Sequence, residues 1–332
     1  MRDRKGRHGL LKEIQHFGIT VTKPFDTLRF YNDTLMFPFV SVNFVQGRSF
    51  ERMYQLESVK NFIAWYQFPT SAMELFYLPW QPPANTKPGD ILKPGYRYAG
   101  YCVEGLDDYI ARLESRRIGY RVARHGGTRA LLVADPTGIN NILFEQKSGS
   151  GRSVGTGIEE AGLTVSDPVA YEQYYDLIGL TRRDESDDGM ESVIQELFRI
   201  DQPVKTIKYG HIRLLHFPES ATASTRKFFP DEGGDNVHAF NDSGLRHVAY
   251  IVEDAQAFYE KARANGVRFI FEPMLVPGGS LISYFLDPEG NTLEVVQPDP
   301  RADKISKFIG SVYSEQFALL ARARRMITKF RF

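Results

Sequence analysis

The sequence predicts an α+β protein made of four related units, arranged as two halves. Each half begins with a strand followed by a helix. Each half also contains a later segment with a strand, an amphipathic helix and an Asp-Pro-x-Gly turn between two strands. The length of 332 residues exceeds the roughly 100–200 residues that one domain usually holds. We therefore expect two domains of two units each.

The two halves start alike. Residues 14–21 alternate between apolar and polar positions like a strand, and residues 24–37 have the apolar spacing of a short helix followed by a turn. In the second half, residues 160–165 and 167–180 repeat that order. This repetition predicts that the first and third units share one architecture.

The second and fourth units are also alike. Residues 98–146 and 247–298 each predict a strand, a helix with a glycine near its C-terminus, another strand and a closing strand pair. The turn in the closing pair reads DPTG in one unit and DPEG in the other. We interpret Asp287 in the second of these turns as a turn-forming residue rather than a catalytic one.

A stretch rich in glycine, serine and charge, QKSGSGRSVGTG, separates the halves and is typical of a flexible connector. Beyond the fourth unit, the segment KISKFIGSVYSEQFALLARARRMI predicts an amphipathic helix with a basic face, packed on the body or at a subunit contact. The expected organisation is a first domain at 1–147, a linker at 148–157, a second domain at 158–300 and a helical tail at 301–332.

Composition favours a small-molecule partner. Lys plus Arg and Asp plus Glu both number 41, so no net charge draws the chain to nucleic acid or to a membrane surface. The single cysteine, Cys102, excludes an intrachain disulfide and leaves histidine and carboxylate as metal ligands. No apolar run reaches the roughly 18 residues of a membrane span, and no secretion signal is evident, so we expect a cytoplasmic protein.

Three motifs give the sequence a resemblance to the vicinal oxygen chelate superfamily. They are FY near the end of the first helix, GLRHVAYIVED at 244–254 and DPEGNTLEVVQ at 287–297. The superfamily includes glyoxalase I, extradiol ring-cleaving dioxygenases, epimerases and antibiotic resistance proteins. The resemblance covers residues 14–298. It implies four βαβββ modules, arranged as two glyoxalase-like domains whose mixed sheets curl around a metal.

The resemblance also implies where metal ligands stand, namely at the start of the first strand and in the middle of the last strand of each module. In the first module these positions hold His16 and Glu74, and in the fourth they hold His247 and Glu294. All four side chains can bind a metal. The first pair of residues precedes the connector and the second pair follows it. In dimeric relatives of glyoxalase I, one metal is likewise shared between modules of two subunits.

The second and third modules have no such ligand set. Tyr98 and Ile142 occupy the two positions in the second module, and Glu160 and Arg213 occupy them in the third. An arginine would repel a cation. We therefore expect one metal site per chain, and a chain that already contains both halves of a site can be a monomer or a homodimer.

Two imidazoles and two carboxylates suit one divalent metal, with Fe(II) favoured and Mn, Ni, Co or Zn possible. If His16, His247 and Glu294 bind alone, they form a facial triad that leaves room for O₂ and a small aromatic diol, either a catechol, which has two neighbouring oxygens, or a hydroquinone. If Glu74 binds as well, the set resembles bacterial glyoxalase I and favours an isomerase, epimerase or lyase.

Two further residues bear on the reaction. The resemblance to extradiol dioxygenases assigns Tyr284, ten residues before Glu294, as a substrate-contacting residue. His238 is a candidate acid or base because it precedes the His247 strand and titrates near neutral pH. The sequence thus favours a ring-cleaving dioxygenase, with a glyoxalase-like or lyase-type enzyme, or a binding-only protein of the same fold, as alternatives.

Overall fold

The computed structural model describes residues 11, 13–81, 83, 90–146, 157–183, 189–218, 240–301 and 304. The predicted linker (apart from Gly157), His238 and nearly all of the predicted helical tail lie outside these residues.

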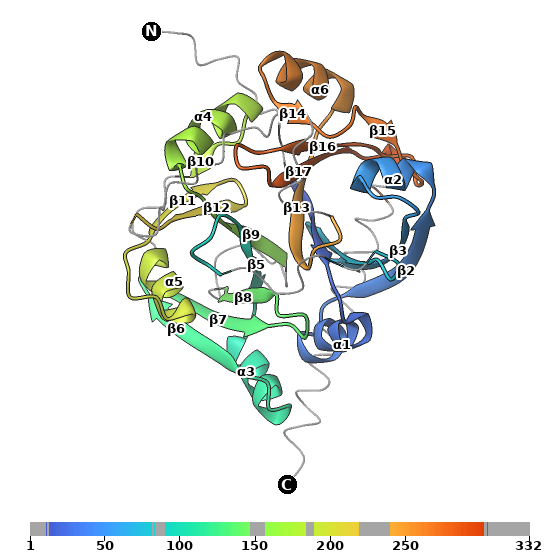
Figure 1. The fold of residues 1–332 in the computed structure, drawn as a ribbon. Helices are drawn as coiled ribbons and strands as arrows, with labels where there is room; N and C mark the ends of the chain where they lie inside the picture. Colours follow the sequence, from blue (N-terminus) through green and yellow to red (C-terminus); the bar gives the residue numbers. More distant parts are fainter. Residues whose placement is uncertain are drawn as a thin grey trace.

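Two large mixed sheets form the molecule (Figure 1). The first has nine strands. Their spatial order is β14 (Arg268–Phe269), β16 (Leu281–Leu286), β17 (Thr292–Gln297), β13 (Gly244–Ile251), β1 (Ile14–Thr20), β4 (Ala72–Tyr77), β3 (Lys60–Gln67) and β2 (Phe39–Gln46), with β15 (Met274–Leu275) paired to β16. This sheet contains the first and fourth modules.

The second sheet has eight strands and contains the second and third modules. Their spatial order is β10 (Arg182–Arg183), β11 (Lys205–Tyr209), β12 (Ile212–His216), β9 (Gly157–Thr164), β5 (Gly95–Val103), β8 (Asn140–Glu145), β7 (Thr128–Ala134) and β6 (Tyr120–His125). In both sheets the first and last strands of a module run side by side and parallel, as β1 and β4 or β13 and β17 do.

Short helices connect the strands. They are α1 (Pro24–Arg29), the π-helix η2 (Phe30–Thr34), α2 (Arg48–Tyr54), α3 (Leu106–Ser115), α4 (Pro168–Ile178), α5 (Met190–Phe198) and α6 (Ala255–Ala264). The predicted α+β class and the four repeating modules are confirmed. The inserted helices α2 and α5, which follow the second strand of the first and third modules, were not predicted.

Capping residues explain where the module helices begin. The side chain of Asp167 accepts hydrogen bonds from the backbone N–H groups of Val169 and Ala170 at the start of α4. Asp254 does the same for Ala257 in α6. In the described part of the chain, no helix combines the length and hydropathy that crossing a membrane requires.

The modules are joined crosswise. Strand β1 pairs antiparallel with β13, and β5 pairs antiparallel with β9, so each sheet is continuous across segments from both halves of the sequence. The sequence halves therefore do not each form a sheet of their own. This is the pairing of first with fourth and second with third module that the ligand positions implied.

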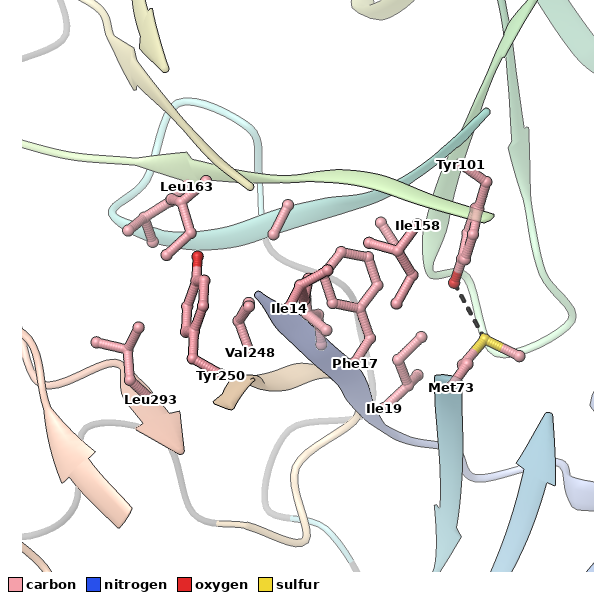
Figure 2. Close-up of a cluster of buried hydrophobic side chains, with 14 of the residues drawn as sticks. Ile14, Phe17, Ile19, Met73, Tyr101, Ile158, Leu163, Val248, Tyr250 and Leu293 are labelled. Atoms are coloured by element: carbon pink, nitrogen blue, oxygen red, sulfur yellow. Dashed lines mark hydrogen bonds between the residues drawn. The ribbon is translucent and has the colours of Figure 1, made fainter. Parts of the chain in front are cut away.

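The main hydrophobic core lies between the two sheets. Figure 2 shows Phe17 and Val248 of the first sheet facing Ile158 and Leu163 of the second. These four side chains are 0–5% exposed. Since neighbouring residues of a strand point to opposite faces, the residues beside these core positions point away from the core.

A bulge sets this alternation at the start of β1. The register with β13 shifts between Ile14 and His16, so Ile14 and Phe17 both face the core while His16 faces the opposite side of the sheet. We call that opposite face of the nine-stranded sheet, which carries His16, His247 and Glu294, the first cup. The equivalent face of the eight-stranded sheet is the second cup.

Candidate metal centre

Three ligand candidates meet at one point in the first cup. The Nε2 atoms of His16 and His247 are 2.9 Å apart. Oε2 of Glu294 lies 3.0 Å from Nε2 of His16 and 3.1 Å from Nε2 of His247. Donor atoms of this trio all lie within 4.8 Å of one another, and all three residues are buried. The structure thus brings together residues from both ends of the sequence.

The fourth candidate lies beside this trio. Oε2 of Glu74 is 3.5 Å from Nε2 of His16, and the Glu74 side chain is 16% exposed, against 4% for Glu294. Glu74 is therefore the member of the group with most access to solvent. Its carboxylate can serve as a fourth ligand or as a proton acceptor next to the metal position.

Backbone register explains the convergence. On β1, Gly18 pairs with His247 of β13 on one side and with Glu74 of β4 on the other. His16 lies two residues before Gly18, on the same face. Glu294 is on β17, the strand parallel to β13. A Cβ atom at Gly18 would overlap the imidazole ring of His247, so glycine leaves the space in which that ring lies.

The charges of the buried groups are complementary. Burial would raise the pKa of Glu294, but the imidazoles of His16 and His247 lower it to about 2. Burial lowers the pKa of His247. At neutral pH, Glu294 is thus a carboxylate and His247 a neutral imidazole, the forms in which both bind metals.

His16 and Glu74 behave differently. Burial would lower the pKa of His16, but the carboxylates of Glu74 and Glu294 raise it above its ordinary value. Burial raises the pKa of Glu74 to about 7. A carboxyl group with this pKa exchanges protons near neutral pH, which suits general acid–base chemistry. Nδ1 of His16 contacts Oε1 of Gln15, its neighbour in sequence.

The donor set fits a divalent metal. With metal–ligand bonds of about 2.1 Å, two neighbouring ligands of an octahedral ion stand about 3.0 Å apart. The three distances of 2.9, 3.0 and 3.1 Å match this spacing. Two nitrogens and one carboxylate oxygen on one face correspond to a two-histidine, one-carboxylate facial triad.

Aromatic rings cover one side of the trio. The Tyr284 ring lies 5.1 Å from that of His247, and Tyr284 pairs with Glu294 across β16 and β17. Phe76 and Phe240 lie 5.7 and 5.9 Å from the His247 ring. Predicted residue Tyr284 is therefore in the cup, beside two of the ligand candidates.

The other side of the trio is more open. Trp65 of β3 pairs with Glu74, is half-buried, and has its ring 6.2 Å from that of His16. Its indole N–H donates to Oε1 of Gln67, whose Nε2 donates to two backbone carbonyls. This network fixes the indole next to Glu74, where it borders the more accessible side of the cup.

The second cup has the same backbone plan with different side chains. On β9, Gly162 pairs with Tyr98 of β5 and with Arg213 of β12. Glu160 precedes Gly162 by two residues, and Ile142 lies on β8, parallel to β5. The register thus confirms the sequence-based match of these residues to the four ligand positions. A Cβ at Gly162 would overlap the Tyr98 ring, as at Gly18.

An internal charge cluster occupies the metal position of the second cup. Nε of Arg213 donates to Oε1 of Glu160 at 2.8 Å, and Nζ of Lys208 lies 3.1 Å from Oε2 of Glu160. The Tyr98 hydroxyl donates to Oε1 of Glu160 at 2.6 Å. Burial would raise the pKa of Glu160, but Arg213 and Lys208 lower it to about 2. Protein cations thus compensate this carboxylate.

Helix α5 fills the rest of the second cup. Met190, Val193, Ile194 and Leu197 are 0–3% exposed and pack in one cluster with Tyr98. The helix contributes apolar side chains where the first cup holds the metal candidates and their aromatic wall. The cups therefore differ in chemistry although their strands match.

Comparisons with known proteins agree with this architecture. Glyoxalase I from Zea mays has a TM-score of 0.58 at 15% identity, covering 90% of this chain and 95% of that one. A provisionally named dioxygenase from Bacillus subtilis subsp. subtilis str. 168 has a TM-score of 0.59 at 15% identity, covering 87% and 86%. A search of curated proteins gives no match.

The chain is thus similar over most of its length to two-domain glyoxalase-like structures. Residues 157–295 match the model of the Glyoxalase/Bleomycin resistance protein/Dioxygenase superfamily. This match covers the second half of the chain and agrees there with the resemblance to the vicinal oxygen chelate superfamily.

Several residues of the first cup were missed from sequence. Trp65 could have been found, since residues 60–67 are rich in aromatic and β-branched side chains, as strands are, and pair with the strand of Glu74. Phe240 and Tyr54 gave no signal, because a loop residue and the last residue of a short inserted helix belong to none of the repeated motifs. His238 lies outside the described residues, so its predicted role as an acid or base stays a prediction.

Proposed function

We propose that this protein is a metal-dependent, ring-cleaving dioxygenase of the extradiol type. Its substrate is a small aromatic diol, a catechol or hydroquinone, and its metal ligands are His16, His247 and Glu294. Fe(II) is the favoured metal, and O₂ is the second substrate. The expected setting is the cytoplasm, and the chain acts as a monomer or homodimer without nucleic acid or membrane.

The observation that carries this proposal is the spacing of the three donor atoms. Separations of 2.9–3.1 Å match the spacing of neighbouring ligands on an octahedral ion, so these three residues would hold the metal and substrate could complete its coordination. When bound there, the metal would supply Lewis acidity and, as Fe(II), the redox chemistry that O₂ requires. The aromatic wall and the half-buried Trp65 support a flat aromatic substrate.

The chain itself supplies proton handling and orientation. Oε2 of Glu74, with a pKa of about 7, can accept the proton that a diol hydroxyl must lose. The pairing of Tyr284 with Glu294 supports a role for Tyr284 in contacting the bound diol. The aromatic side chains around His247 exclude water from that side of the site.

The test is anaerobic purification with metal analysis, followed by measurement of O₂ uptake with catechols and hydroquinones. We expect about one metal ion per chain and O₂ consumption that depends on iron. His247→Ala should weaken metal binding by more than about 100-fold, because even changes beyond the ligands cost 10- to 100-fold. His125→Ala is the matched control, since His125 is exposed and pairs only with Glu196 among the described residues.

An isomerase or lyase of the glyoxalase type is the second candidate, and Glu74 favours it. A carboxylate 3.5 Å from His16 with a pKa near 7 can move a proton between two substrate carbons beside a redox-silent metal. Activity retained after iron is replaced by Ni or Zn would exclude the dioxygenase. Metal binding without turnover of any diol or α-hydroxy carbonyl compound would instead favour a binding-only protein.

A further inference from the structure

Tyr54, at the end of the inserted helix α2, lies in the aromatic wall of the first cup. Its ring stacks on that of Phe240 at 3.9 Å and 12°, and lies 6.2 Å from the ring of Phe76. Phe240 in turn lies parallel to Tyr284 at 6.2 Å and 9°. Tyr54 is 4% exposed. Two tyrosines thus flank one phenylalanine beside His247.

The strand register sets where the Tyr54 hydroxyl lies. Nδ2 of Asn61 donates to Oη of Tyr54 at 3.1 Å. Asn61 and Trp65 are four residues apart on β3, so both point to the same face, and Trp65 pairs with Glu74. Asn61 therefore holds the hydroxyl of Tyr54 over the cup face of β3, and β3 is the neighbour of β4, the strand that carries Glu74.

The direction of that hydrogen bond leaves the phenol proton available. The backbone N–H of Tyr77 donates to Oδ1 of Asn61 at 3.1 Å, which identifies Oδ1 as the carbonyl oxygen and Nδ2 as the donor to Tyr54. Oη of Tyr54 is thus an acceptor in this bond. Among the described residues, no acceptor receives its own proton.

We infer that Tyr54 is a substrate-binding residue of the first cup, whose hydroxyl donates a hydrogen bond to one of the two oxygens of the diol. The inference rests on the proposed function and adds a donor from the first module to Tyr284 from the fourth. Burial raises the pKa of Tyr54, with a further contribution from Glu74, so the phenol keeps its proton at neutral pH. The hydrogen bond from this phenol is strongest to a ligand oxygen that carries negative charge.

The test uses 4-nitrocatechol, whose colour reports binding and ionisation, added without O₂ to the full-length protein loaded with Fe(II) or Zn(II). Tyr54→Phe removes the hydroxyl and keeps the ring stack. We expect it to bind 4-nitrocatechol about 10- to 100-fold more weakly, the usual effect of losing a hydrogen bond to a charged group. Metal content should stay unchanged, whereas the thermal midpoint should fall slightly, because Nδ2 of the buried Asn61 loses its acceptor.

The matched control is Tyr66→Phe. Tyr66 is also a buried tyrosine, but its hydroxyl donates to Asn32, and its ring packs in the core between the sheets. This variant should bind the probe within about twofold of wild type, because no hydrogen bond to a ligand is lost.

Asn61→Asp is a second, independent variant. Aspartate keeps an oxygen for the N–H of Tyr77 but replaces the amide donor with an acceptor, which draws the Tyr54 proton toward itself. When it is combined with Tyr54→Phe, the two changes should weaken probe binding no more than Tyr54→Phe alone, because both remove the hydrogen bond from Tyr54 to the probe.

The outcomes separate the two proposals. If Tyr54→Phe binds the probe as tightly as wild type while wild type binds it through the metal, the inference is overturned and the proposed function stands. If metal-loaded wild type does not bind 4-nitrocatechol, the inference is overturned, and so is the proposed function for catechols. Weaker binding by Tyr54→Phe alone, with metal retained, supports the inference.

Discussion

At the scale of single residues, one missing side chain decides whether the metal candidates can meet. Gly18 lies beneath His247, and its lack of a Cβ makes room for the imidazole ring. The same relation holds for Gly162 and Tyr98 in the second cup. The two glycines therefore provide a matched pair for testing the site.

We expect Gly18→Ala to displace the His247 ring and weaken metal binding at least about tenfold, with about 1–3 kcal/mol lost in the free energy of unfolding from overpacking. Gly162→Ala should cost similar stability but leave metal affinity unchanged, since it disturbs only Tyr98. Metal titrations followed by Trp65 fluorescence in a Trp80→Phe background, together with denaturant unfolding, measure both effects. Equal metal affinity in the two variants would contradict the role assigned to Gly18.

Sequence reasoning found the residues that sit in recognisable local motifs. His247 and Glu294 lie in the two strongest motifs, and His16 and Glu74 follow from their positions in the first module. Tyr54 could not be found in this way, because its place in the cup depends on packing against Phe240 from a distant loop. Contacts of this kind leave no periodic signal in the sequence.

At the scale of elements, the second cup shows how strands with the same register as those of the first cup can carry a buried ion-pair cluster in place of metal-ligand candidates. Glu160 of β9 is bound by Arg213 of β12, Lys208 of β11 and Tyr98 of β5, so one carboxylate joins four strands. Breaking a buried ion pair leaves uncompensated charge, which is costly in the protein interior.

Glu160→Gln should lower the free energy of unfolding at pH 7 by about 3–5 kcal/mol, because Arg213 and Lys208 lose their buried partner. The folded-state pKa of Glu160 is about 2, below its ordinary value of 4.5. Its stabilisation is therefore present above pH 4.5 and is lost as the pH falls toward 2.

Denaturant unfolding of wild type and Glu160→Gln across this pH range measures the effect. The difference between them should be constant above about pH 5 and narrow below it. Glu196→Gln, which removes an exposed partner of His125, is the control and should change stability by less than about 1 kcal/mol. A difference that widens on acidification would contradict this account.

The inserted helices α2 and α5 were the elements that sequence did not predict. Each follows the second strand of its module, and each packs over its own cup, through Tyr54 in one case and Leu197 in the other. The repeated motifs indicated only the helix after the first strand. The two inserted helices are seven and nine residues long, which is too short for a clear periodic pattern in the sequence.

At the scale of the whole molecule, each of the two sheets combines strands from both halves of the chain. Both β1 with β13 and β5 with β9 join segments from opposite sides of the connector. The crosswise pairing was predictable because the good ligands stand in the first and fourth modules. The side-by-side arrangement of the sheets and their shared core required the structure (Figure 1).

Two separate chains, cut within the connector at 148–156, should therefore assemble when they are co-expressed. We expect them to co-purify under native conditions, bind about one metal ion per pair and separate in denaturant, because sheet hydrogen bonds and the common core hold them. Neither half alone should bind the metal with wild-type affinity. A first half that does so by itself would show that His247 and Glu294 are dispensable.

The distribution of the ligand candidates also determines when the centre can form during synthesis. A nascent chain carries His16 and Glu74 from an early stage, whereas His247 and Glu294 emerge only after most of the protein has left the ribosome. One edge of β1 lacks its partner strand until β13 has been synthesised. With the proposed ligands His16, His247 and Glu294, metal can load only onto a nearly finished polypeptide, and a prematurely terminated product lacks two of the three ligands.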